Sequence, residues 1–120
     1  MRLALAFLAL SASGLAATLA QKIDAILSSV NAKTGEVVIN QKRLPELSTL
    51  YSSPVAAAGR IYICSREGNT VVLKHGREFE VLATNSLDEQ TIDATPAIVG
   101  NELILRGESH LYCISEQQSQ

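Results

Sequence analysis

The chain of 120 residues has no tryptophan, three tyrosines and two phenylalanines. Aromatic side chains are the usual anchors of tight protein interfaces and the platforms on which nucleic-acid bases stack. Positive charge is also modest, because ten lysines and arginines stand against twelve acidic residues and form no basic stripe. Nucleic-acid binding depends on clustered positive charge that neutralises phosphates. We therefore expect no nucleic acid among the partners of this chain.

Metal ligands and catalytic motifs are scarce as well. The soft ligands are Cys64, His75, His110 and Cys113, and the two cysteines do not have the C-x₂₋₄-C spacing of a zinc site. The sequence contains no nucleophile elbow, no phosphate-cradling glycine loop and no His-Glu-x-x-His motif. We therefore predict no catalytic, metal-binding or cofactor-binding residues, no cofactor and no enzymatic activity, with both histidines exposed or half-buried.

An acidic cluster and a serine pair are the remaining polar features. Asp88, Glu89 and Asp93 lie within one short stretch, and Ser52 and Ser53 precede a proline. Neighbouring carboxylates bind calcium or transfer protons when burial tunes them, but on a connecting loop they are more often solvated. The serines fall at a position that is repeated later in the chain. We interpret both features as structural.

The two cysteines, Cys64 and Cys113, each lie in an apolar, strand-like run. A free cysteine in such a run behaves as a small hydrophobic side chain. An exported chain permits a disulfide, but the geometry that one requires is narrow. We expect two buried thiols, and a disulfide stays the alternative.

The first 20 residues have the pattern of a secretory signal. Arg2 precedes the apolar run Leu3–Leu10, and Thr18 and Ala20 are small residues at the −3 and −1 positions of a cleavage site. A membrane anchor is the alternative, but residues 3–20 contain two serines, a threonine and a glycine and make a weak span. We predict a cleaved signal over 1–20 and an exported chain, periplasmic or secreted, with signal-anchor retention as the minor alternative.

An internal repeat is the strongest pattern in the rest of the chain. It consists of three matched pairs of segments: Ser53–Val55 with Thr95–Ala97 and Ile61–Ile63 with Leu103–Leu105, both at an offset of 42, and Thr70–Leu73 with His110–Cys113 at an offset of 40. A period of about 40–45 residues built from short strands is typical of β-propeller blades. The repeat therefore predicts an all-β fold.

Turn residues divide the repeat region into short strands. Ala58-Gly59 and Gly100-Asn101 are suited to hairpin turns, and they separate runs rich in aliphatic and β-branched residues. They predict a full four-stranded blade over 50–87, with an outer strand at 79–84, and partial blades over 26–39 and 92–114. The segment 22–30 has helical spacing of its apolar residues, although the repeat favours a strand. Residues 116–120 form a polar tail.

One turn sequence resembles a known family. Asn31–Ile39 reads Asn-Ala-Lys-Thr-Gly-Glu-Val-Val-Ile. It is similar to the last turn of a blade in the pyrroloquinoline-quinone-type (PQQ-like) β-propeller repeat family, which typically reads Asp-Ala-Lys-Thr-Gly, a basic residue, two aliphatic residues and a tryptophan. The departures are Asn31, Glu36 and Ile39, at the positions of the aspartate, the basic residue and the tryptophan.

Further segments resemble other strands of such a blade. Ser52–Val55 with Gly59–Ile63 looks like its first two strands, and His110–Ile114 looks like its third. The resemblance covers about residues 26–115 and implies antiparallel four-stranded blades. A closed ring has at least four blades of about 40 residues each. We therefore expect a partial β-propeller with an incomplete ring, after an N-terminal signal helix.

The resemblance also bears on function. Quinoprotein dehydrogenases of this fold hold their quinone with a tryptophan, a vicinal cysteine pair and calcium, and this sequence has no tryptophan and no adjacent cysteines. We predict a non-catalytic exported module that acts as a scaffold or protein-binding surface, through another protein or through self-association of exposed blade faces. Periplasmic propellers that assist outer-membrane protein assembly are the nearest analogy. The alternatives are a remnant of a quinoprotein dehydrogenase or a truncated fragment without independent function.

Overall fold

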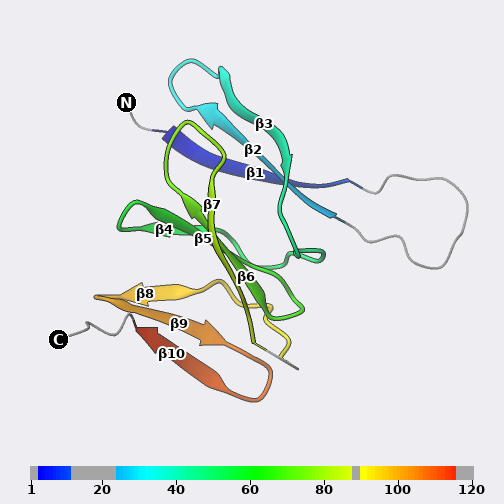
Figure 1. The fold of residues 1–120 in the computed structure, drawn as a ribbon, viewed down its shortest axis with the longest axis vertical. Helices are drawn as coiled ribbons and strands as arrows, with labels where there is room; N and C mark the ends of the chain where they lie inside the picture. Colours follow the sequence, from blue (N-terminus) through cyan, green and yellow to red (C-terminus); the bar gives the residue numbers. More distant parts are fainter. Residues whose placement is uncertain (1–2, 12–23, 88–89, 116–120) are drawn as a thin grey trace, which may run out of the picture.

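The computed structural model describes residues 3–11, 24–87 and 90–115, and in them ten strands form three antiparallel sheets (Figure 1). The strands are β1 (Leu3–Ser11), β2 (Asp24–Asn31), β3 (Val37–Arg43), β4 (Val55–Ala57), β5 (Arg60–Cys64), β6 (Asn69–Lys74), β7 (Val81–Ser86), β8 (Ala97–Val99), β9 (Glu102–Arg106) and β10 (Leu111–Ser115). The predicted all-β class is confirmed. The described part of the chain contains no helix long and apolar enough to cross a membrane.

The three sheets follow one another along the chain. We call them the first sheet (β1-β2-β3), the middle sheet (β4-β5-β6-β7) and the last sheet (β8-β9-β10). Figure 1 shows the middle sheet between the other two. Each sheet joins sequence neighbours in antiparallel order. Short local connections of this kind need only tight turns.

Hairpin turns at two repeated places set the strand ends. Ala58 and Gly59 both have positive φ, 49° and 73°, which is the backbone of a type I′ turn. Gly100, with φ 59°, occupies the first central position of the matching β8–β9 turn. Both turns lie where the sequence predicted them. The outer strand β7 begins at Val81 instead of Phe79, because the Phe79 side chain packs into a core cluster ahead of the strand.

The N-terminal region differs from the expected signal helix. Leu3–Ser11 forms β1, which pairs with β2 along its length. β2 in turn pairs with β3, so its backbone has ladder partners on both sides, and the ambiguous segment 22–30 is a strand from Asp24 onward. Residues 12–20 and 116–120 lie outside the described residues. The cleaved signal and the polar tail therefore stay predictions.

Two hydrophobic clusters hold the sheets face to face. The first lies between the first and middle sheets and consists of Ala25, Leu27, Leu44, Leu47, Leu50, Ile63, Val71 and Leu73. The second lies between the middle and last sheets and has Cys64, Ile92 and Leu105 as its buried members. Successive strand residues point to opposite faces, so neighbours on β5 serve different clusters. The second cluster is the smaller one, and this difference shapes the candidate site.

The internal repeat is also present in the packing. Ile63 and Leu105, 42 residues apart in the sequence, are both fully buried, and Leu50 and Ile92 at the same offset are both buried. Equivalent residues therefore occupy equivalent places in successive sheets.

The connections between sheets repeat as well. The Leu44 amide donates to the Ala25 carbonyl, and the Leu87 amide donates to the Gly68 carbonyl, both over 2.9 Å. The two hydrogen bonds are related by an offset of 43 residues. Each connection is thus hydrogen-bonded to the backbone at the start of the strand beside the one that it leaves.

Strand register corrects one part of the repeat alignment. Ile63 is paired with Val71 in the middle sheet, and its equivalent Leu105 is paired with Tyr112 in the last sheet. The third strands are therefore related by an offset of 41, and the predicted offset of 40 was wrong. The turn in the last sheet is only one residue shorter. A slip of one residue exchanges the two faces of a strand, so Cys113 corresponds to Val72 and not to the buried Leu73.

Candidate functional site

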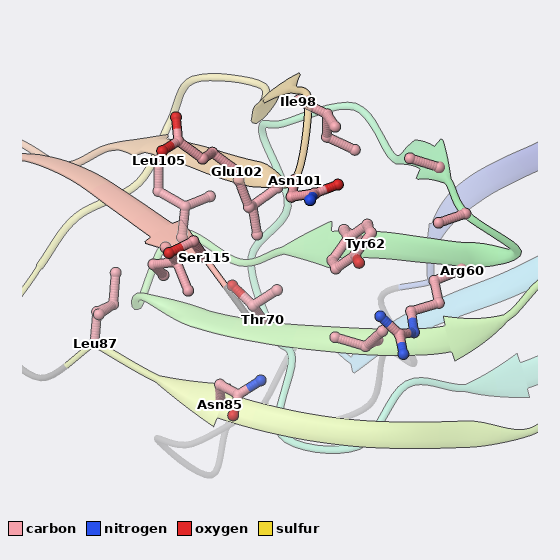
Figure 2. A pocket seen from close by; sticks show the side chains of 16 residues that line it. Arg60, Tyr62, Thr70, Asn85, Leu87, Ile98, Asn101, Glu102, Leu105 and Ser115 are labelled. Atoms are coloured by element: carbon pink, nitrogen blue, oxygen red, sulfur yellow. The ribbon is translucent and has the colours of Figure 1, made fainter. Parts of the chain in front are cut away.

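A cleft of about 570 Å³ opens between the middle and last sheets (Figure 2). Its walls are largely apolar, with Tyr62 and Val72 from the middle sheet facing Leu103 and Ile114 from the last sheet. Polar side chains stand at its rim. They include Arg60, Asn85, Asn101, Glu102 and Ser115.

The cleft exists because the second interface is filled at one end only. Near Cys64 the sheets meet in the second cluster, and the cleft extends from there toward the two hairpin turns. In the first interface Phe79 packs against the cluster, and Leu73 is 2% exposed. Its equivalent in the last sheet, Ile114, is 44% exposed. The same repeat position thus lines a filled core in one interface and an open cleft in the other.

Polar contacts fix the closed end of the cleft. Thr70 Oγ1 and Cys64 Sγ lie 3.2 Å apart, and the Ser52 hydroxyl donates to the Cys64 carbonyl over 2.8 Å. The Ser53 amide donates to Thr95 Oγ1 over 3.0 Å. This bond joins two residues that occupy the same repeat position in successive sheets. The serine pair thus has structural contacts.

The two cysteines are free, and they differ in environment. Burial raises the pKa of the Cys64 thiol, although the Thr70 hydroxyl opposes the shift. Cys113 is exposed, so the expectation that it is buried was wrong. The physical reason is the register, which turns Cys113 to the uncovered face of the last sheet. Its pKa is also raised, by desolvation and by the neighbouring Glu102 carboxylate.

The other polar residues considered from sequence do not gather in one site. His75 and His110 are exposed on different sheets, and the His110 ring contacts the Ser109 hydroxyl at 2.8 Å. Asp93 pairs with Arg66 Nε at 3.0 Å, while 88–89 lie outside the described residues. Within the described ranges no group of three or more His, Cys, Asp or Glu side chains could hold a metal ion.

A second, charged hollow of about 380 Å³ lies beside the Arg66–Asp93 pair and includes Arg106 and Glu108. The Arg66 guanidinium also lies 5.0 Å from the centre of the Tyr51 ring. Cation–π and ionic contacts together hold this arginine in place. The hollow thus lies where the connection between the middle and last sheets meets the turns that follow β5 and β9.

Sequence reasoning did not find the cleft. The one available signal is the alternation on β5, where Arg60 and Tyr62 interrupt an otherwise aliphatic strand and share a face. No family model and no curated protein matches this sequence. An apolar cleft with a polar rim is the usual form of a binding site, in which the walls supply affinity and the rim supplies orientation.

Proposed function

We propose that the chain is a non-catalytic, exported β-propeller repeat module of the PQQ-like type, which serves as a scaffold or protein-binding surface. The observation that carries the proposal is the stacking of antiparallel meanders that repeat every 41–43 residues, with an apolar cleft left between two of them. Repeat folds of this kind bind through surfaces formed between neighbouring units.

The cleft suits a short extended segment of another protein. Its volume of about 570 Å³ falls within the range of about 300–1,000 Å³ that is usual for ligand pockets. The apolar walls accommodate alternate side chains of an extended peptide, and the amides of Asn85 and Asn101 can bond its backbone at the rim.

The test uses two adjacent alanines that face opposite sides of β4. Ala57 lines the cleft, whereas Ala56 is exposed outside it. The variant Ala57→Trp fills the cleft, and Ala56→Trp is the matched control. We expect fluorescein-labelled peptides of alternating apolar and polar residues to bind the native chain and Ala56→Trp, as measured by fluorescence anisotropy, and to lose binding to Ala57→Trp.

Two outcomes contradict the proposal. Either no peptide of this class binds the folded native chain, or the two variants bind equally well while circular dichroism shows both to be folded. Dye-linked alcohol oxidation on addition of quinone and calcium would favour the dehydrogenase alternative instead.

A further inference from the structure

The middle and last sheets differ by one strand. The middle sheet has the order β4-β5-β6-β7, whereas the last sheet has the order β8-β9-β10 in the described residues. In the internal repeat β10 corresponds to β6, and β7 pairs with β6 on the side away from β5. The equivalent side of β10 has no paired strand in the described part of the chain, and Figure 1 shows it at the outside of the last sheet. We call this side the open edge.

The turn before β10 shows which backbone groups the open edge presents. The Gly107 amide donates to the His110 carbonyl over 2.8 Å, so the His110 carbonyl points toward the β9 side of the strand. These directions alternate along an antiparallel strand. The amides and carbonyls that point to the open edge are therefore those of Leu111, Cys113 and Ser115.

The middle sheet shows what binds groups of this kind. Ser115 corresponds to Lys74, whose amide donates to the Glu80 carbonyl over 3.0 Å. At the other end of β6, the Gly68 carbonyl accepts from the Leu87 amide over 2.9 Å. Strand β7 lies between these two bonds. The outer backbone groups of β6 are thus bound by one extended segment that runs antiparallel to it.

The sequence of β10 does not protect the open edge against an added strand. Natural sheet edges are usually blocked by charges, prolines or bulges. The outer strand β3 carries Lys42 and Arg43, and the pairing of β6 with β7 contains a register shift. β10 has no charge and no proline, and it pairs with β9 without a shift. Its two faces present Leu111 and Ile114, which are both exposed.

β7 also indicates which side chains an added strand needs. Val81 pairs with Leu73, and Phe79 ahead of it packs against the first cluster. Leu73 is buried, whereas its equivalent Ile114 is exposed in the wall of the cleft. A strand on β10 in the register of β7 places its two corresponding residues beside Ile114. Apolar side chains at these two positions would cover it.

We infer that the open edge of β10 binds an extended segment of a partner protein as an antiparallel fourth strand, in the register that β7 has on β6. The inference deepens the proposed function and rests on it, because it names the backbone that holds the extended segment. In this mode of recognition, main-chain hydrogen bonds supply affinity and the pockets for alternate side chains supply specificity. The segment is apolar at the positions that correspond to Phe79 and Val81.

The probe is a fluorescein-labelled peptide with the sequence of residues 79–86, Phe-Glu-Val-Leu-Ala-Thr-Asn-Ser. Fluorescence anisotropy measures its binding to the full chain. Ala83 pairs with Val72, the equivalent of Cys113, so the Ala83 amide of the bound peptide faces the open edge and the next amide, of Thr84, faces away. We expect N-methylation at Ala83 to weaken binding about tenfold, the effect of one lost hydrogen bond, and N-methylation at Thr84 to leave it unchanged.

A proline in the chain tests the same edge from the other side. Cys113→Pro removes an amide that points to the open edge, where an edge strand tolerates proline. Thr84→Pro is the matched control, because the Thr84 amide points outward from β7, the outer strand of the middle sheet. We expect Cys113→Pro to weaken peptide binding about tenfold and Thr84→Pro to leave it unchanged, with circular dichroism showing both to be folded. If Cys113→Pro does not fold, the two methylated peptides decide.

Three results overturn the inference. They are no binding of the peptide to the folded native chain, equal binding of the two methylated peptides, or a dimer that forms without peptide binding and is lost in Cys113→Pro, which would assign the edge to a second copy. Peptide binding that Ala57→Trp abolishes and Cys113→Pro leaves unchanged refutes the added strand and supports the proposed function. A native chain that binds neither this peptide nor the alternating peptides refutes both.

Discussion

Gly68 is the position at which the fold tolerates a side chain least. It has φ +86° and lies in the turn between β5 and β6, where the connection to the last sheet attaches. A Cβ at this position would meet the Leu87 carbonyl oxygen at a forbidden separation and the Gln90 carbonyl oxygen at 2.9 Å. Both atoms belong to backbone, which yields less readily than a side chain. Gly68→Ala therefore forces the connection away from the turn.

The cost can be built from its parts. An alanine at positive φ costs about 1–2 kcal/mol. Displacement of the connection removes the 2.9 Å hydrogen bond from the Leu87 amide to the Gly68 carbonyl, for about 1 kcal/mol. It also loosens the half-buried Leu87 side chain in the second cluster, for about 1 kcal/mol more. We expect Gly68→Ala to lower the free energy of unfolding by about 3–4 kcal/mol.

Gly59 provides a matched control. Its φ is +73°, but a Cβ there meets nothing within 4 Å. Gly59→Ala carries the same backbone cost of about 1–2 kcal/mol and the same change in unfolded-state entropy, without the collision. The difference between the two variants, about 2 kcal/mol, therefore isolates the contact with the connection. For a domain of this size it corresponds to about 8–16 °C in the unfolding temperature.

Urea unfolding followed by circular dichroism measures both variants against the native chain. Equal destabilisation by Gly68→Ala and Gly59→Ala, within about 0.5 kcal/mol, would refute the reasoning, because it would mean that the connection does not press on the turn. A large effect of Gly59→Ala alone would locate the sensitive contact in the hairpin instead.

Two further predictions concern ionisable groups. Ellman's reagent should react with Cys113 in the native chain and with Cys64 only on unfolding. Glu102→Gln should speed the reaction of Cys113, because loss of the carboxylate lowers the raised pKa of the Cys113 thiol and yields more thiolate. An unchanged rate would contradict the contact between Glu102 and Cys113. Burial tends to raise the pKa of Glu67, but hydrogen bonds to its carboxylate, one of them from the Thr49 amide, outweigh burial and lower the pKa below 4.5. The contribution of Glu67 to stability is therefore present above the unfolded-state pKa and is lost as the pH falls through the folded-state pKa. Glu67→Gln should reduce the loss of unfolding free energy at acid pH. The same acid-pH dependence of the unfolding free energy in both proteins would disprove this.

The strands of the middle sheet were predictable because their signals are local. Turn residues bracket β5 and β6, and aliphatic and β-branched side chains fill them, so the repeat segments Ile61–Ile63 and Thr70–Leu73 fall within the two strands. β2 was ambiguous because its apolar spacing fits a helix as well. Its strand state depends on ladder partners on both sides, β1 and β3, which no local pattern reveals.

The cleft was not predictable for a different reason. Its position depends on how far two sheets separate, which is set by what fills the space between them. Leu73 and Ile114 occupy equivalent strand positions and have similar side chains, yet only the first is buried. In the first interface Phe79 packs against the cluster, and this residue lies outside the strand to which it contributes. Sequence alignment of the strands alone cannot express that difference.

A single residue of loop length decides which side chains of β10 face the cleft and the second cluster. The turn between β5 and β6 joins the paired residues Cys64 and Thr70, while the turn between β9 and β10 joins Arg106 and Leu111 and is one residue shorter. Both turns lead into the same pattern of strand pairing, so the shorter turn shifts every residue of β10 by one position relative to its counterpart in β6. This brings Tyr112 into the second cluster and turns Leu111 and Cys113 to the exposed face of the sheet. An extra glycine inserted after Gly107 would lengthen the turn without requiring any change in the pairing, and β10 would then keep its faces. If the inserted residue instead shifted the strand, Cys113 would turn toward the middle sheet and become protected from thiol reagents, which a slower reaction with Ellman's reagent would report.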